Sequence, residues 1–209
     1  MKMVFLGPPG AGKGTLAALA SARMGLPHLS TGDLFRAAVK DGSELGERVK
    51  NILDEGRLVP DELTIALVKE RLSRSDARKG WILDGFPRTT GQAEALDAIA
   101  GPDWVINFHV EDSVILKRLT GRRICSGCGK IYHVVTMPPA AEGKCDACGA
   151  DLYTRPDDRE ESIRTRLSAY RNQTAPLIQW YGDKGKLVTI DGTGSPEAVY
   201  ERFAEAVKA

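Results

Sequence analysis

The sequence has no excess of either charge and no long hydrophobic run. Its 29 Lys and Arg residues nearly balance its 28 Asp and Glu residues, which leaves a formal net charge of +1 over 209 residues. This balance gives no general attraction to nucleic acid or to an anionic membrane, and we expect neither as a partner. No window is apolar for long enough to predict a membrane-spanning helix. The length suits one domain with small insertions.

Cysteine is also scarce, with four residues in the chain. The first residues lead straight into an apolar strand without a secretory signal, so a cytoplasmic location is expected. Thiols stay reduced there, which argues against disulfides. The cysteines form two pairs separated by sixteen residues, and the pairs are Cys125/Cys128 and Cys145/Cys148. This spacing is typical of a tetrahedral zinc site, and four cysteine ligands leave no position for catalysis.

Two other interpretations of the cysteines stay open. Another thiophilic metal such as iron suits the same ligands, and four unrelated buried thiols are the simplest alternative. The stretch around them, residues 121–158, breaks the rhythm of strands and helices and is predicted to be a small inserted module. It carries five basic and five acidic residues. A module without net positive charge is not expected to bind a nucleic-acid backbone.

A glycine-rich stretch, GPPGAGKGT at residues 7–15, follows the apolar run at residues 3–6. Glycines let backbone N–H groups turn inward around an anion, and a following helix adds the positive end of its dipole. Lys13 can then reach the outer phosphates of a nucleotide. The hydroxyl that usually follows this lysine comes one position later, at Thr15. An ordinary glycine-rich turn is the alternative, but the place between a strand and a helix favours a phosphate-binding loop.

Short apolar runs predict five strands, at residues 2–6, 27–30, 81–84, 104–110 and 186–191. They are continuous in apolar character, as in strands buried on both faces of a parallel sheet. Helices are predicted between and after them, at residues 13–24, 34–39, 61–74, 89–100, 112–119, 158–181 and 196–208. This alternation predicts an α/β fold in which a five-stranded parallel sheet is flanked by helices. Ligands of such sheets bind beyond the carboxyl ends of the strands.

A second phosphate site is indicated by the stretch WILDGFPR at residues 81–88. Its apolar strand delivers Asp84 to the edge of the sheet, where an acid can hold Mg²⁺ through water in phosphate-loop enzymes. Arg88 follows at a distance suited to clamping another phosphate. Taken alone, Asp84 is equally well explained as a helix-capping residue and as a residue that binds magnesium. The phosphate loop makes the magnesium role the better hypothesis.

Several stretches together resemble one known family over the whole length, and they read GPPGAGKGT, STGDLFR, ILDGFPRT, GRR, TRPDDREESIRTRL and DGTG. The sequence is similar to the adenylate kinases, of the long type whose lid carries a four-cysteine zinc site. Gly14 after the lysine is this family's own form of the loop. The resemblance implies a P-loop nucleoside monophosphate kinase fold and reversible transfer from Mg-ATP to AMP, giving two ADP.

The resemblance also implies a monomer that serves adenine nucleotide homeostasis. Its core is expected at residues 1–29, 60–120 and 159–209, with an AMP-binding segment at 30–59 and a zinc-bearing lid at 121–158. Contacts with ATP are implied for Gly10, Ala11, Gly12, Lys13, Gly14, Thr15, Arg118, Arg122, Ile131, Tyr132 and Gly194. Contacts with AMP are implied for Thr31, Arg36, Arg57, Leu58, Val59, Gly85, Phe86, Pro87, Arg88, Gln92, Arg155 and Arg166.

The catalytic set implied in this way holds no general base, and it consists of Lys13, Arg88, Arg122, Arg155 and Arg166. An AMP phosphate is largely dianionic at neutral pH, so cancelling phosphate charge is the task that remains. The amide of Gln92 suits an adenine edge. Tyr132 and His133 also have a plainer interpretation as surface residues of the lid. Another nucleoside monophosphate kinase, or a zinc-ribbon protein that senses a nucleotide, are the alternative functions.

Overall fold

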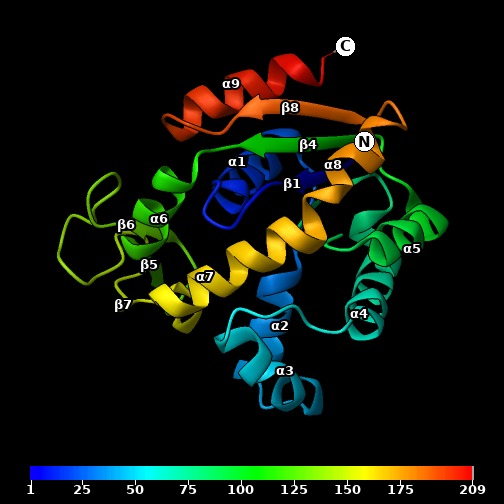
Figure 1. Ribbon diagram of the computed structural model, residues 1–209. Coiled ribbons are helices and arrows are strands. Elements are labelled where there is room, and N and C mark those ends of the chain that lie inside the picture. Colours follow the sequence, from blue (N-terminus) through cyan, green and yellow to red (C-terminus); the bar gives the residue numbers. More distant parts are fainter. Residues whose placement is uncertain (209) are drawn as a thin grey trace.

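A parallel β-sheet forms the centre of the computed structural model, which describes residues 1–208 (Figure 1). The strand order is β2-β3-β1-β4-β8, and all four neighbouring pairs are parallel. The strands are β1 (Lys2–Leu6), β2 (His28–Ser30), β3 (Trp81–Asp84), β4 (Trp104–His109) and β8 (Leu187–Asp191). The predicted five-stranded parallel sheet is thereby confirmed. Its carboxyl ends share one edge, which is where α/β sheets bind ligands.

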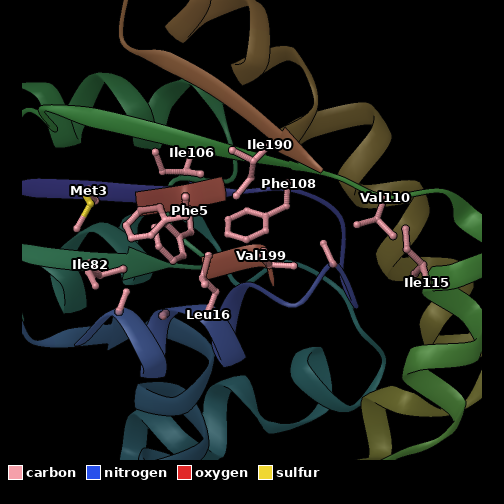
Figure 2. Close-up of a cluster of buried hydrophobic side chains, with 14 of the residues drawn as sticks. Met3, Phe5, Leu16, Ile82, Ile106, Phe108, Val110, Ile115, Ile190 and Val199 are labelled. Atoms are coloured by element: carbon pink, nitrogen blue, oxygen red, sulfur yellow. The ribbon is translucent and has the colours of Figure 1, made fainter. Parts of the chain in front are cut away.

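Helices cover both faces of the sheet because successive residues of each strand point to opposite sides. Met3 and Phe5 of β1 belong to one buried cluster, and Val4 and Leu6 belong to another. The first cluster lies under α1 (Lys13–Met24) and α9 (Pro196–Ala206), and Figure 2 shows its aromatic centre. The second lies under α4 (Asp61–Ser73), α5 (Thr90–Ala100) and α8 (Pro176–Gly182). The two clusters explain the continuous apolar runs of the strands.

A pair of helices, α2 (Thr31–Lys40) and α3 (Glu44–Asp54), stands at the bottom of the view in Figure 1. Phe35, Val49 and Val59 form a separate buried cluster there, with further apolar side chains around it. At Gly46 the helices approach so closely that an added Cβ would lie 2.2 Å from the carbonyl oxygen of Ala38. This region therefore has an apolar core of its own.

A small antiparallel sheet extends to one side of the molecule (Figure 1). It consists of β5 (Arg122–Cys125), β6 (Ile131–His133) and β7 (Leu152–Tyr153), in the order β6-β5-β7. Between α6 (Asp112–Thr120) and a short 3₁₀ turn at Pro156–Asp158, the chain departs from the main sheet as predicted. The only buried residues that cluster in this lid, within residues 1–208, are Cys125, Tyr132 and Cys145.

Two predicted helices need correction, and a third helix was missed. The helix predicted over residues 158–181 is three pieces: α7 (Glu160–Ala169), a π-helical turn at Tyr170–Thr174, and α8 after Pro176. Proline lacks an N–H and is tolerated only in a first helical turn, so α8 starts there. Helix α3 was not predicted at all. Helix α2 begins before the predicted residue 34, because the Ser30 hydroxyl caps it by accepting from the backbone N–H of Asp33.

Another short 3₁₀ turn lies at Ser75–Ala77, after α4. No helix within residues 1–208 is both long enough and apolar enough to cross a membrane.

Candidate functional site

The glycine-rich loop joins β1 to α1 and leaves its backbone open to an anion. Gly12 is the N-cap of α1 with φ 95°, a left-handed conformation that side chains rarely adopt. At Gly7 an added Cβ would lie 2.9 Å from the carbonyl oxygen of Phe108. No side chain caps α1, and its first turn holds no acidic residue. The free N–H groups and the helix dipole are therefore available to phosphate.

Lys13 points back into this loop. Its Nζ donates hydrogen bonds of 2.8 Å to the carbonyl oxygens of Gly7 and of Pro8. Burial lowers the pKa of Lys13 to about 8, with Asp84 opposing the shift and nearby arginines such as Arg88 adding to it. The side chain is thus mostly charged at neutral pH. It can exchange two carbonyl oxygens for phosphate oxygens, which carry more negative charge.

A cavity of about 850 Å³ extends from this loop between the main sheet, the lid and α2. Sixteen of the implied nucleotide contacts line it together with Lys13, Arg88, Arg122 and Asp84, and these sixteen are Gly10, Ala11, Gly12, Gly14, Thr15, Arg36, Arg57, Leu58, Gly85, Pro87, Arg118, Ile131, Tyr132, Arg155, Arg166 and Gly194. Four others are buried beside it without lining it, namely Thr31, Val59, Phe86 and Gln92. The fold therefore gathers residues from many separate stretches of sequence around one space.

Several arginines converge on the cavity and are held by buried acids. Arg122 forms a two-pronged contact with Asp158, with Nε and Nη2 at 2.7 and 2.6 Å from its two carboxylate oxygens. Arg166 Nη1 lies 3.1 Å from the same carboxylate and 2.9 Å from that of Asp157. The side chain of Asp158 is 0% exposed. One buried aspartate thus sets the spacing of two guanidinium groups from different elements.

The charges of this cluster persist at neutral pH. Burial lowers the pKa of Arg88 to about 10, and it lowers that of Arg155 to about 10 as well. Burial tends to raise the pKa of Asp157, but Arg166 and other arginines outweigh it and the pKa falls. Positive charges this close to one another repel. This repulsion favours any ligand that brings several negative oxygens.

Asp33 makes a further link across the cavity. Its Oδ1 lies 2.6 Å from Nη2 of Arg36 on α2 and 3.4 Å from Nη2 of Arg155, which follows β7 of the lid. Burial opposes ionisation of Asp33, yet the two arginines lower its pKa. The lid and the α2–α3 pair therefore meet through one carboxylate and two cations.

Asp84 lies at the carboxyl end of β3, opposite Phe5 of β1. Burial opposes its ionisation, but neighbouring His28 and the charge of Lys13 lower its pKa. His28 Nε2 is 3.6 Å from Asp84 Oδ2, which is too long for a direct hydrogen bond. A Cβ at Gly14 would lie 3.4 Å from the same oxygen, so the carboxylate faces the phosphate loop. A charged carboxylate at this place suits a hydrated divalent cation.

The four cysteines meet at one point of the lid. Their Sγ atoms all lie within 4.8 Å of one another, and two of the separations are 3.4 Å and 3.6 Å. Ligands about 2.3 Å from a tetrahedral zinc ion would be about 3.8 Å apart. The Tyr132 hydroxyl is 3.4 Å from Cys145 Sγ, and it lowers the pKa of that thiol to about 6. The cluster can bind a metal ion, and its donors fit a thiophilic one.

Tyr132 and His133 are not surface residues of the lid. Tyr132 is 3% exposed, and its hydroxyl accepts a 2.8 Å hydrogen bond from the backbone N–H of Asp146. His133 is 9% exposed, and its Nδ1 accepts from the backbone N–H groups of Val135 and Thr136. Its Nε2 lies 3.1 Å from the carbonyl oxygen of Lys117 on α6, so it connects the lid to the core. The plainer interpretation of both residues is wrong.

Apart from Asp84, the acids of the site were not singled out from the sequence. Asp157 and Asp158 counted only as negative charges of the lid, although they stand beside arginines in the TRPDDR stretch. Asp33 lies in the STGDLFR stretch. Their spacing along the chain does not show which arginine each one meets, because Arg122 and Asp158 are 36 residues apart. Adjacent acids in an arginine-rich stretch were the one available signal.

Comparison with known proteins agrees with this geometry. The family model described as adenylate kinase matches residues 5–186. The chain is 56% identical to an adenylate kinase of Treponema denticola over 203 residues, which cover 97% of each chain. It is 49% identical to one of Thermosipho africanus over the full length of both chains, and 50% identical to one of Archaeoglobus fulgidus over 97% of this chain and 96% of the relative. The chain belongs to the adenylate kinase family.

Proposed function

We propose that the residues of this cavity carry out the adenylate kinase reaction in the roles that follow. The reaction moves the terminal phosphoryl group of Mg-ATP to AMP and gives two ADP. One observation carries the assignment of roles: a single cavity of about 850 Å³ is lined both by the phosphate loop and by Arg36 with Arg88. Two phosphate-binding regions in one space suit two nucleotides that face each other.

The donor nucleotide lies along the phosphate loop. The N–H groups at the start of α1 and the Lys13 ammonium bind its phosphates, since both present positive charge to the cavity. Arg118 bonds the carbonyl oxygens of Ala11 and Gly192, at 3.2 and 3.0 Å, and so its guanidinium is fixed flat beside the loop. Its plane and the neighbouring residues Ile131, Tyr132 and Gly194 flank the donor base.

The acceptor lies between α2 and the end of β3. Arg36 and Arg88 bind the phosphate of AMP, and the adenine lies toward Gln92. Supporting this, the residues from Arg57 to Val59 bring main chain to the same region, and Thr31 donates a 2.9 Å hydrogen bond to the carbonyl oxygen of Gly85. Residues 30–59 are accordingly the AMP-binding segment, residues 121–158 the lid, and the remainder the core.

Charge cancellation drives the chemistry. An oxygen of the AMP phosphate attacks the terminal phosphorus of ATP in line, the bond from that phosphorus to the bridging oxygen breaks, and ADP leaves with that oxygen. The dianionic nucleophile has no proton to lose, so no general base is required. Lys13, Arg88, Arg122, Arg155 and Arg166 surround the phosphoryl group in transit. Guanidinium groups suit this because they bind phosphate bidentately and stay charged.

The metals have separate tasks. Asp84 holds the magnesium of Mg-ATP through water, supported by its ionised carboxylate beside the phosphate loop. Cys125, Cys128, Cys145 and Cys148 would hold zinc, which would supply a crosslink within the lid, and four thiolate ligands leave no open position for catalysis. A monomeric state, a cytoplasmic location and the lack of nucleic-acid or membrane partners remain predictions.

A Lys13→Met variant tests the assignment in a coupled assay of ADP formation from ATP with and without AMP. Loss of a charge contact made in the transition state costs about 3–4 kcal/mol, or roughly 10²–10³ in kcat. The wild type should form two ADP for each ATP, and only with AMP present. Substituting the distant Lys40, an exposed residue at the end of α2, should leave kcat unchanged. A Lys13→Met variant with more than about a tenth of wild-type kcat would contradict the role of Lys13.

A further inference from the structure

The amide of Gln92 is held from two sides by groups of opposite character. Its Oε1 accepts a 2.8 Å hydrogen bond from the backbone N–H of Arg88. Its Nε2 donates a 2.7 Å hydrogen bond to Oδ1 of Asp61, which stands 31 residues earlier at the start of α4. The side chain is 2% exposed. Water therefore cannot replace either contact at no cost.

These partners dictate which end of the amide is oxygen. A backbone N–H can only donate, and a carboxylate can only accept. If the amide turned over, its NH₂ group would face the Arg88 N–H and its oxygen would face the Asp61 carboxylate. Both contacts would then be repulsive, with buried groups left unsatisfied. The chemistry of the two neighbours fixes the orientation.

Asp61 is itself held in place on its other side. Its Oδ2 accepts a 2.6 Å hydrogen bond from the hydroxyl of Thr89, and that hydroxyl oxygen accepts from the backbone N–H of Gln92 as the cap of α5. One carboxylate thus joins the start of α4 to the start of α5 and to the side chain of Gln92. An acid in the first turn of a helix is common for electrostatic reasons alone. That electrostatic role does not require a hydrogen bond to a buried amide on another helix, which Asp61 also makes.

An amide held in this way keeps one lone pair on its oxygen and one N–H on its nitrogen for a ligand. The edge of adenine offers a donor at its 6-amino group and an acceptor at N1, which matches that pair. A 6-oxopurine reverses the pattern, with an acceptor at O6 and a donor at N1–H. Only the reversed amide would suit it.

We propose that Asp61 is a positioning residue that sets the preference of the acceptor site for a 6-aminopurine over a 6-oxopurine. It acts through Gln92 and touches no nucleotide itself. This inference rests on the proposed placement of the AMP base beside Gln92. The discrimination comes from the cost of reversing a doubly held amide, because a site with fixed buried polar groups rejects a ligand that leaves them unpaired.

The test compares Asp61→Asn with the wild type, using AMP and IMP as alternative acceptors with Mg-ATP as donor. The introduced amide can turn its own N–H toward a reversed Gln92 amide, so reversal then loses only the Arg88 contact. The ratio of kcat/KM for AMP to that for IMP should fall about tenfold or more, the effect of one charged hydrogen bond. The larger share of the loss with AMP should lie in KM.

The matched control is Glu62→Gln, the same chemical change one residue later on an exposed side chain. Glu62→Gln should keep the wild-type ratio. Asp61→Glu keeps a carboxylate, so its ratio should lie between those of Asp61→Asn and the wild type. Should Asp61→Asn fail to fold by its melting curve, Asp61→Ser keeps a short side chain at the start of α4 and gives the same readout. A folded variant whose ratio stays within twofold of wild type overturns the inference, as does an equal effect of Glu62→Gln.

A Gln92→Leu variant tests the contact between Gln92 and the base separately from the role of Asp61. If it loses the preference for AMP while Asp61→Asn keeps it, Gln92 reads the base and the role of Asp61 is wrong. If Gln92→Leu itself keeps the wild-type ratio, the placement of the base is wrong and the inference fails with it. Loss of the preference in both variants supports both steps.

Discussion

The lid and the α2–α3 pair flank the same cavity, but different forces hold each together. The α2–α3 region has its own apolar cluster, with Phe35 and Val49 almost fully buried. The lid has a three-stranded sheet whose buried cluster is two cysteines and Tyr132. Ile124 of β5 is buried, whereas Val134 and Val135, which follow β6, are exposed. One flank is stabilised by hydrophobic burial, whereas we expect the other to depend on its cysteine ligands.

The difference shows how a small module can be stable without a core. Burial of apolar side chains requires enough chain to surround them, and a module of fewer than about 40 residues cannot usually provide it. A tetrahedral metal site links four positions at once and contributes its binding free energy to folding. Removing the metal ligands should therefore destabilise the lid alone, and removing the apolar cluster should destabilise the α2–α3 pair alone.

The largest effect is expected from removing the metal ligands. Replacing Cys145 and Cys148 with serine should abolish metal binding, which is worth roughly 10–16 kcal/mol in small cysteine-rich sites. The lid should loosen and the melting temperature should fall, while affinity for AMP stays near wild type. Metal content, calorimetry and kcat on one preparation provide the measurement.

A Glu142→Gln variant controls for changes elsewhere in the lid, since that side chain is exposed. Measurable kinase activity should remain in the double cysteine variant at moderate temperature. A metal-free enzyme as heat-stable as wild type, yet inactive while folded, would mean that the metal is catalytic.

The α2–α3 pair should be destabilised by a substitution in its apolar core. Phe35→Ala should cost about 3–5 kcal/mol of local stability, because a buried ring is lost and a cavity remains. Amide hydrogen exchange across α2 and α3 should accelerate and AMP should bind more weakly, with metal content unchanged. Val135→Ala in the lid, where the side chain is 77% exposed, should alter neither property. Equal loss of protection in the lid would show that the two flanks are not independent.

Arg88→Ala tests the division between the two nucleotides. Arg88 Nε is held by a 2.8 Å hydrogen bond to the carbonyl oxygen of Gly85, which keeps the guanidinium on the acceptor side. Loss of a charged contact should weaken AMP binding by about 1.5–3 kcal/mol and ATP binding far less. Separate titrations of AMP and ATP measure this, with Arg23→Ala on the outer side of α1 as the control. Equal losses of affinity for both nucleotides would contradict the assignment of Arg88 to the AMP phosphate.

The smallest effect is a pH dependence of Mg-ATP binding. Free Lys13 has a pKa of about 8, and bound phosphates raise it because they favour the charged amine. Below pH 8 the amine is already charged, so this group adds no pH dependence. Above pH 8 binding must take up a proton, and Kd should rise by up to about tenfold per pH unit.

Titration calorimetry from about pH 7 to 9 measures this rise, and Lys13→Arg should flatten it because a guanidinium stays charged over that range. A wild-type Kd that is constant across the range would show that Lys13 does not titrate in the free site.

Most of the fold follows from patterns within short stretches. The five strands of the main sheet lie within one residue of those predicted, because continuous apolar runs mark strands buried on both faces. The three short strands of the lid were not predicted. Helix α3 was missed although Leu45, Val49, Ile52 and Leu53 have helical spacing. The break of the long helix at Tyr170–Thr174 was also missed, although Pro176 was a signal for it.

Short-range patterns in the sequence were enough to predict the parts whose chemistry is local. Closely spaced glycines around Lys13 predict a phosphate loop, and paired cysteines at short spacing predict a metal site, because neighbouring residues already supply the required geometry. Which charges meet depends instead on the packing of distant elements. Asp158 reaches Arg122 across 36 residues, and Asp61 reaches Gln92 across 31. Such contacts depend on how α4, α5, α7 and the lid pack together, and the spacing of residues along the chain carries no record of it.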